Sequence, residues 1–78
     1  MKMTDQPIIG EKYHWNNSEV KVLNVRYNYK MAKQFKDGSV YSGNTTYDVE
    51  IEDVTPNGRF LGTKIWTPFT AAGFDLIK

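Results

Sequence analysis

The most constraining feature of the sequence is an alternation of apolar and acidic residues that is followed by a turn signal. Tyr47, Val49 and Ile51 are separated by single acidic residues, which is the two-residue period of a strand with one buried face. Residues 56–58 (Pro-Asn-Gly) then combine the preset φ of proline with two residues that tolerate positive φ. The stretch 45–69 therefore predicts two antiparallel strands joined by a tight turn, against which the rest of the chain packs.

The length and composition fit one small domain. The chain has 78 residues, of which 40% are hydrophobic and 14% aromatic, and it has no cysteine. We predict a lead-in over residues 1–7 and a single domain over residues 8–78. Without cysteine there is neither a disulfide nor a thiolate metal site, and small domains of this kind often gain stability as homo-oligomers. No stretch resembles a signal peptide or a membrane span, so we expect a cytoplasmic protein with no membrane partner.

Two strands are predicted before the hairpin. Residues 8–15 predict the first, with a bend or bulge at Gly10, and residues 16–18 predict a turn. The second strand changes phase along its length: its apolar positions are Val20 and Val22 before the change, and Val25, Tyr27, Tyr29 and Met31 after it. A β-bulge near Leu23 and Asn24 reconciles the two phases.

Charged residues are segregated along the chain. Those in residues 12–36 are basic apart from Glu19, whereas those in residues 37–53 are all acidic. If these segments are neighbouring antiparallel strands, opposite charges face each other across the ladder. We expect positions 24, 26, 28 and 30 to lie opposite positions 48, 50 and 52. The alternative is a bipolar surface that steers a charged partner.

The remaining segments have weaker signals. Residues 32–44 lack periodicity and predict a long loop, of a length that is often functional in so small a domain. No segment has the apolar spacing and length of an amphipathic helix. Residues 70–73 predict a single helical turn, and residues 74–77 predict a short last strand.

This order of elements resembles the SH3-like small barrels, a superfold that includes SH3, Tudor and KOW-type domains. The most specific parts are Gly10-x-x-Tyr13-x-Trp15 and the Trp-Thr-Pro-Phe run of residues 66–69. The resemblance covers about residues 8 to 77 and implies an all-β, five-stranded SH3-like barrel with one long loop and a single helical turn before the last strand. An OB-type barrel is the alternative. The asparagine and tyrosine usage, the lack of cysteine and the small size also resemble accessory proteins of tailed bacteriophages, many of which bind and inhibit one host macromolecule.

Catalytic motifs are missing from the sequence. His14 is the only histidine, no serine stands in a Gly-x-Ser-x-Gly turn, and there is no phosphate-binding glycine loop. The acidic run of residues 48–53 lacks the glycine of a calcium loop. We therefore expect a protein that is not an enzyme and that uses no metal and no cofactor.

The sequence instead predicts a binding module, and a protein is the favoured partner. Aromatic residues ringed by charged ones are typical of an interface core with a polar rim. Phe35 and Tyr41 would supply the buried contact area, and the surrounding lysines would orient the partner. The predicted partner-binding residues are Lys30, Lys33, Phe35, Lys36 and Tyr41, with Trp66 as an anchor.

Two other kinds of ligand stay open. Basic and aromatic residues alternate over residues 26–36, as in small barrels that stack bases and neutralise phosphates. The nucleic-acid-binding residues would be Arg26, Tyr29, Lys30, Lys33 and Lys36. A third alternative is an oligomer that holds a small ligand such as a nucleotide between its subunits. Whether Trp15 and Trp66 belong to the core or to the surface also stays open.

Overall fold

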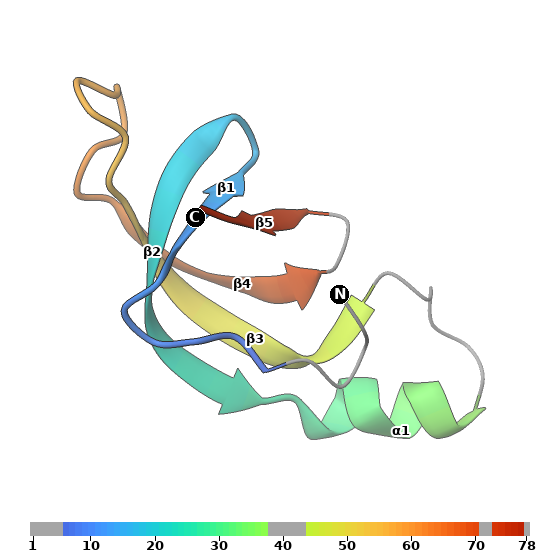
Figure 1. Cartoon of the computed structure of the whole chain (residues 1–78). Helices are drawn as coiled ribbons and strands as arrows, with labels where there is room; N and C mark the ends of the chain where they lie inside the picture. Colours follow the sequence, from blue (N-terminus) through green and yellow to red (C-terminus); the bar gives the residue numbers. More distant parts are fainter. Residues whose placement is uncertain (1–5, 38–43, 71–72, 78) are drawn as a thin grey trace.

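The computed structural model describes residues 6–37, 44–70 and 73–77 and shows an all-β domain with one short helix (Figure 1). In chain order the elements are β1 (Lys12–Trp15), β2 (Ser18–Tyr27), α1 (Tyr29–Asp37), β3 (Asn44–Asp53), β4 (Lys64–Thr70) and β5 (Phe74–Leu76). The strands form one antiparallel sheet in the order β4-β3-β2-β1-β5. The predicted all-β fold with five strands is confirmed. The arrangement is compatible with a small barrel-like fold, but the sheet is not closed in the described part of the chain.

Both predicted turns are present and use positive φ. Asn16 and Asn17 have φ of 50° and 63°, which fits the type I′ turn of a two-residue hairpin between β1 and β2. In the second turn the N–H of Gly58 donates to the carbonyl of Thr55 at 2.9 Å, and Asn57 between them has a φ of 57°. The connection from β3 to β4 is nevertheless longer than the predicted tight turn. It spans residues 54–63, because β4 begins only at Lys64.

The predicted bend and bulge also lie where the sequence indicates. Gly10 has a φ of 92° and donates to the carbonyl of Val22 at 2.8 Å, while Val22 donates to the carbonyl of Glu11 at 3.0 Å. Two residues thus face one, which is a bulge, and β1 begins at Lys12 rather than at residue 8. Farther along β2, the register against β3 shifts between Val22 and Asn24, as the phase change predicts.

Opposite charges do face each other across β2 and β3. Arg26 pairs in register with Asp48, and its Nη2 lies 3.2 Å from the Asp48 carboxylate. Asn24 pairs with Glu50 and donates to its Oε1 at 2.7 Å. This confirms the predicted cross-strand pairing at these positions. Lys30 does not take part, since it lies in α1.

The helix α1 is a correction to the sequence analysis, which predicts strand up to residue 31 and loop from residue 32. Asn28 acts as its N-cap: the Oδ1 atom accepts the N–H of Met31 at 2.9 Å. Ala32, whose N–H donates to the carbonyl of Asn28 at 3.0 Å, continues a run of good helix formers. Of the helical turn predicted over residues 70–73, Thr70 belongs instead to β4, while residues 71–72 lie outside the described residues, as do residues 38–43.

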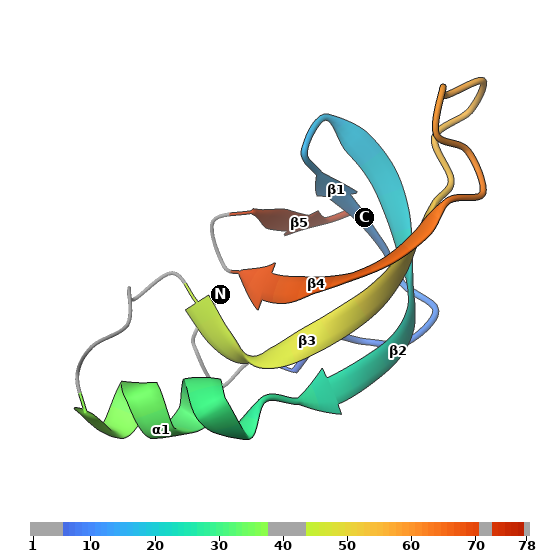
Figure 2. The ribbon, with the colours of Figure 1, turned by 180° about the vertical axis from the view of Figure 1, so that it is seen from behind.

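The core lies on the concave face of the curled sheet, as the views from the front and from behind show (Figures 1 and 2). Its buried apolar side chains are Tyr13, Val20, Val22, Val49, Ile51, Phe69 and Phe74. The ring of Tyr13 lies edge-on to those of Phe69 and Phe74, with centroids 5.6 and 6.0 Å apart. The strand period predicts Val20, Val22, Val49 and Ile51 of this core, whereas Tyr27, from the predicted apolar face of β2, is 42% exposed.

Candidate binding site

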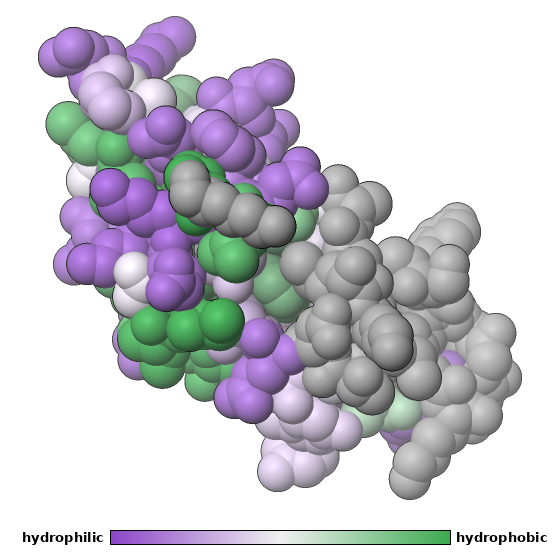
Figure 3. All heavy atoms as spheres, in the orientation of Figure 1, coloured by the Kyte–Doolittle hydropathy of each residue, from purple (hydrophilic) through white to green (hydrophobic). Residues whose placement is uncertain are grey.

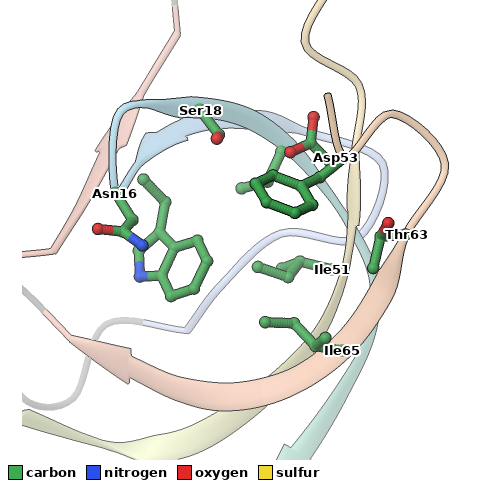
Figure 4. Close-up of a pocket in the computed structure, with 9 residues that line it drawn as sticks. Asn16, Ser18, Ile51, Asp53, Thr63 and Ile65 are labelled. Atoms are coloured by element: carbon green, nitrogen blue, oxygen red, sulfur yellow. The ribbon is translucent and has the colours of Figure 1, made fainter. Parts of the chain in front are cut away.

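A pocket of about 310 Å³ opens on the concave side of the sheet (Figure 4). Ile51 of β3 and Ile65 of β4 point into it side by side, and Ser18, Asp53 and Thr63 lie around its rim. The residues that line it are Trp15, Asn16, Ser18, Val20, Ile51, Asp53, Phe60, Thr63 and Ile65. They come from four strands, from the turn between β1 and β2 and from the connection between β3 and β4, so the curvature of the sheet creates the pocket.

The lining is largely apolar and partly open to solvent. The indole of Trp15 stacks on the ring of Phe74, with centroids 5.6 Å apart and an interplanar angle of 19°. Phe60 and Ile65 are 60% and 43% exposed, although both are large and apolar. Figure 3 shows apolar side chains reaching the surface among hydrophilic ones on one face of the molecule. Exposed apolar groups around a formed hollow are typical of an interaction site.

Hydrogen bonds fix the wall that the connection between β3 and β4 provides. The N–H of Glu19 donates to Oγ1 of Thr55 at 2.9 Å, and the N–H of Val54 donates to the carbonyl of Glu19 at 2.9 Å. At the other end of the connection, Gly62 donates to the carbonyl of Asp53 at 2.8 Å. The start of β2 therefore holds the connection in place as a wall of the pocket.

Asp53 supplies the charge at the rim and is the one ionisable residue among the described residues that line the pocket. Its Oδ1 accepts the N–H of Thr55 at 2.9 Å. Hydrogen bonds from the Thr55 backbone, and then from the hydroxyls of Thr55 and Ser18, lower the pKa of Asp53 although desolvation opposes them. The pocket thus combines an apolar floor with an anionic rim at neutral pH.

A second, smaller hollow lies on the outer face of the sheet. The guanidinium of Arg26 lies 4.5 Å above the centroid of Trp66 and 3.2 Å from Asp48. Asn28 donates from Nδ2 to both carboxylate oxygens of Asp48, at 3.3 and 3.2 Å. The hollow, of about 170 Å³, is lined by these four residues with Thr67 and Pro68. Because its polar groups bind one another, this hollow has fewer polar groups available to a ligand than the pocket has.

The two tryptophans lie on opposite faces of the sheet. Trp15 packs against the core and lines the pocket. Trp66 is 44% exposed, and because it follows Ile65, which faces the pocket, it points to the other side of the sheet. The sequence leaves the place of both tryptophans open. The predicted anchor, Trp66, therefore lies on the outer face, beside Arg26.

The other predicted site residues lie on α1 or outside the described residues. Lys30 and Lys33 are exposed on α1. Phe35 and Lys36 belong to the same helix, but their side chains are not among the described parts of the structure. Tyr41 lies wholly outside the described residues. The predicted set as a whole stays a prediction.

The structure describes the positions of part of the residue set predicted for nucleic-acid binding. Tyr29 is 79% exposed and lies edge-on to Tyr27, with ring centroids 4.8 Å apart. It begins the helix that carries Lys30 and Lys33, whereas Arg26 lies on β2 and is held by Asp48. Tyr29, Lys30 and Lys33 thus lie close together at the start of α1, whereas Arg26 does not belong to this group.

The pocket itself is missed by the sequence analysis. Phe60 and Ile65 appear there only as part of a predicted strand, and Asp53 only as part of an acidic run. One signal is available in the sequence: Phe60 and Leu61 are apolar but directly precede a glycine. In the structure both residues belong to the connection rather than to β4.

Within residues 6–37, 44–70 and 73–77, no three histidine, cysteine or acidic residues lie close enough together to hold a metal ion. In the same residues no helix is long and apolar enough to cross a membrane. The chain matches no protein-family model, no curated protein and no solved structure.

Proposed function

We propose that this protein is a non-catalytic protein-binding module whose pocket receives a side chain of its partner. The observation that carries the proposal is the exposure of Phe60 and Ile65, 60% and 43%, on the walls of a formed apolar pocket. Its volume of about 310 Å³ is that of a site for a small group, and buried anchors in such pockets dominate many interfaces. Polar residues around the opening give the site the rim that protein interfaces commonly have.

The proposal includes the type of fold and the source that the sequence pattern suggests. An SH3-like small barrel is supported by the five short antiparallel strands and by the order in which they pair. A phage-encoded accessory protein directed at a host macromolecule is supported by the asparagine and tyrosine usage, the small size and the lack of cysteine.

Substitution of two neighbouring loop residues tests the proposal. Phe60→Ala removes a wall of the pocket, whereas Leu61→Ala removes a side chain of similar exposure, 57%, that does not line it. Partners are captured from a nuclease-treated lysate on each tagged variant and identified by mass spectrometry. We expect the partner to be lost with Phe60→Ala and kept with Leu61→Ala, at similar thermal midpoints. Capture that Phe60→Ala leaves unchanged would show that the pocket is not the site.

Nucleic-acid binding at the start of α1 is the second candidate. Tyr29, at 79% exposure, offers an exposed ring on which a base could stack, and Lys30 and Lys33 offer charges for phosphates. Against it, Asp48 and Glu50 lie on the neighbouring outer face. A fluorescent single-stranded oligonucleotide tests this candidate, because its affinity would fall steeply between low and physiological salt and with Lys30→Gln and Lys33→Gln combined.

A further inference from the structure

We propose that the side chain received by the pocket is an arginine of the partner protein. This inference rests on the proposed function and names the chemistry of its ligand. The described lining offers two aromatic rings, Trp15 and Phe60, and a single ionisable group, Asp53. A guanidinium is the side-chain group that both stacks on aromatic faces and pairs with a carboxylate through parallel hydrogen bonds.

On the outer face the molecule already brings a guanidinium, an indole and a carboxylate of its own together. There the guanidinium of Arg26 lies 4.5 Å above the indole of Trp66 and 3.2 Å from the carboxylate of Asp48. In the pocket the chain provides the indole of Trp15 and the carboxylate of Asp53, and the partner would provide the guanidinium. The outer-face cluster thus contains the three kinds of group that the proposed complex would bring together.

The floor of the pocket suits the rest of an arginine side chain. Val20 and Ile51 are buried and apolar, and they would pack against the methylene groups while the charged end stays at the rim. A purely aliphatic side chain would also pack on this floor. However, it would displace water from Asp53 without donating a hydrogen bond to the carboxylate. The charge at the rim therefore favours a cation over a neutral side chain.

Arg59 bears on the same inference in two ways. Its guanidinium lies 5.8 Å from the centroid of Phe60, which is within the range of a cation–π contact. The position of this ring therefore suits a cation. Arg59 is also a positive charge close to the pocket, and it would repel a second one. We therefore expect Arg59→Gln to tighten the binding of an arginine ligand rather than weaken it.

Short blocked peptides of the form Gly-Gly-X-Gly-Gly test the inference on the intact chain. X is arginine, citrulline, lysine or leucine; citrulline keeps the size and planarity of arginine without its charge. Binding is followed by ¹H–¹⁵N NMR at the indole N–H of Trp15 and the amides of Phe60 and Thr63. We expect the arginine peptide to bind these sites about fivefold more tightly than the citrulline peptide.

A matched pair of variants then tests the role of the carboxylate. Asp53→Asn removes the charge but keeps an oxygen that can accept the N–H of Thr55. Glu52→Gln makes the same change of charge at the neighbouring position of β3, which faces outward. We expect Asp53→Asn to weaken the arginine peptide about tenfold without affecting the citrulline peptide, and Glu52→Gln to change neither affinity appreciably.

The outcomes separate this inference from the proposed function. If leucine, lysine or citrulline peptides bind the pocket as tightly as the arginine peptide, the assignment of arginine is overturned and the pocket remains a protein-binding site. An Asp53→Asn variant that binds the arginine peptide as tightly as the unchanged chain also overturns it. If none of the four peptides shifts the pocket signals, both the inference and the proposed function are contradicted.

Discussion

The guanidinium of Arg26 lies over the indole of Trp66, with 4.5 Å between Cζ and the ring centroid, while its Nη2 lies 3.2 Å from the carboxylate of Asp48. The three side chains come from β2, β4 and β3, three neighbouring strands. The cluster therefore ties these strands together on the outer face, opposite the core. Its Arg26 side chain is 60% exposed, so solvent weakens its ion pair with Asp48.

A double-mutant cycle measures how strongly Arg26 and Trp66 interact. We expect Arg26→Ala and Trp66→Leu each to lower the free energy of unfolding, and the two changes to couple by about 0.5–1 kcal/mol. Chemical denaturation of the four proteins gives the coupling. A coupling of zero would mean that the ring and the guanidinium are merely adjacent.

The cap of α1 is tested at Asn28, whose Oδ1 accepts the N–H of Met31. We expect Asn28→Ala to lower the free energy of unfolding by about 1 kcal/mol and to speed hydrogen exchange at Met31. Asn28→Ser is the matched control, because serine also caps helices and both variants lose the amide bonds to Asp48. Equal stability and equal exchange in the two variants would argue against the cap.

The turn before β4 has no room for a side chain at Gly58. A Cβ atom there would lie 2.7 Å from Cβ of Thr55, and Thr55 cannot easily yield because it is bonded to Glu19. We expect Gly58→Ala to lower the free energy of unfolding by about 1–3 kcal/mol. Asn57→Gly, in the same turn at a φ of 57°, should be nearly neutral. Equally stable variants in a urea denaturation experiment would rule out the clash.

The pH dependence of stability tests the hydrogen bonds of Asp53. Because the Thr55 backbone and hydroxyl and the Ser18 hydroxyl lower its pKa in the folded state, ionised Asp53 stabilises that state at neutral pH. The contribution is present above the unfolded pKa and is lost as the pH falls through the folded pKa, below about pH 4. We therefore expect the difference in unfolding free energy between the unchanged chain and Asp53→Asn to shrink there. A difference that is constant down to about pH 2 would contradict the lowered pKa.

Local features of the fold could be predicted from the sequence because their physical cause is local. Asn16 and Asn17 form a turn because asparagine tolerates positive φ, and the bulge between Val22 and Asn24 appears as a change of phase in the apolar pattern. The pairing of Arg26 with Asp48 follows once that shift is included.

The helix α1 was missed because two periods overlap at its start. Tyr27 and Tyr29 continue the alternation of β2, so the strand period extends past its true end at Tyr27. The opposing signals were present: Asn28 is a good N-cap, and residues 31–34 (Met-Ala-Lys-Gln) favour a helix.

The pocket could not be predicted from local pattern at all. Trp15 and Phe60 line the same pocket only because the sheet curls and because Thr55 ties the connection between β3 and β4 to β2. Single-strand periodicity shows that Ile51 and Ile65 face inward, but it does not show that the space above them is left open.

Site-specific photocrosslinking tests most directly whether the partner binds at the pocket. Two variants, Phe60→p-benzoylphenylalanine and Tyr29→p-benzoylphenylalanine, place the same reactive ring at the pocket and at the start of α1. Each is irradiated in a lysate of the cells in which the protein is naturally made, and adducts are identified by mass spectrometry. We predict a protein adduct from position 60 and none from position 29. Adducts from position 29 alone, with protein or with nucleic acid, would contradict a binding site at the pocket.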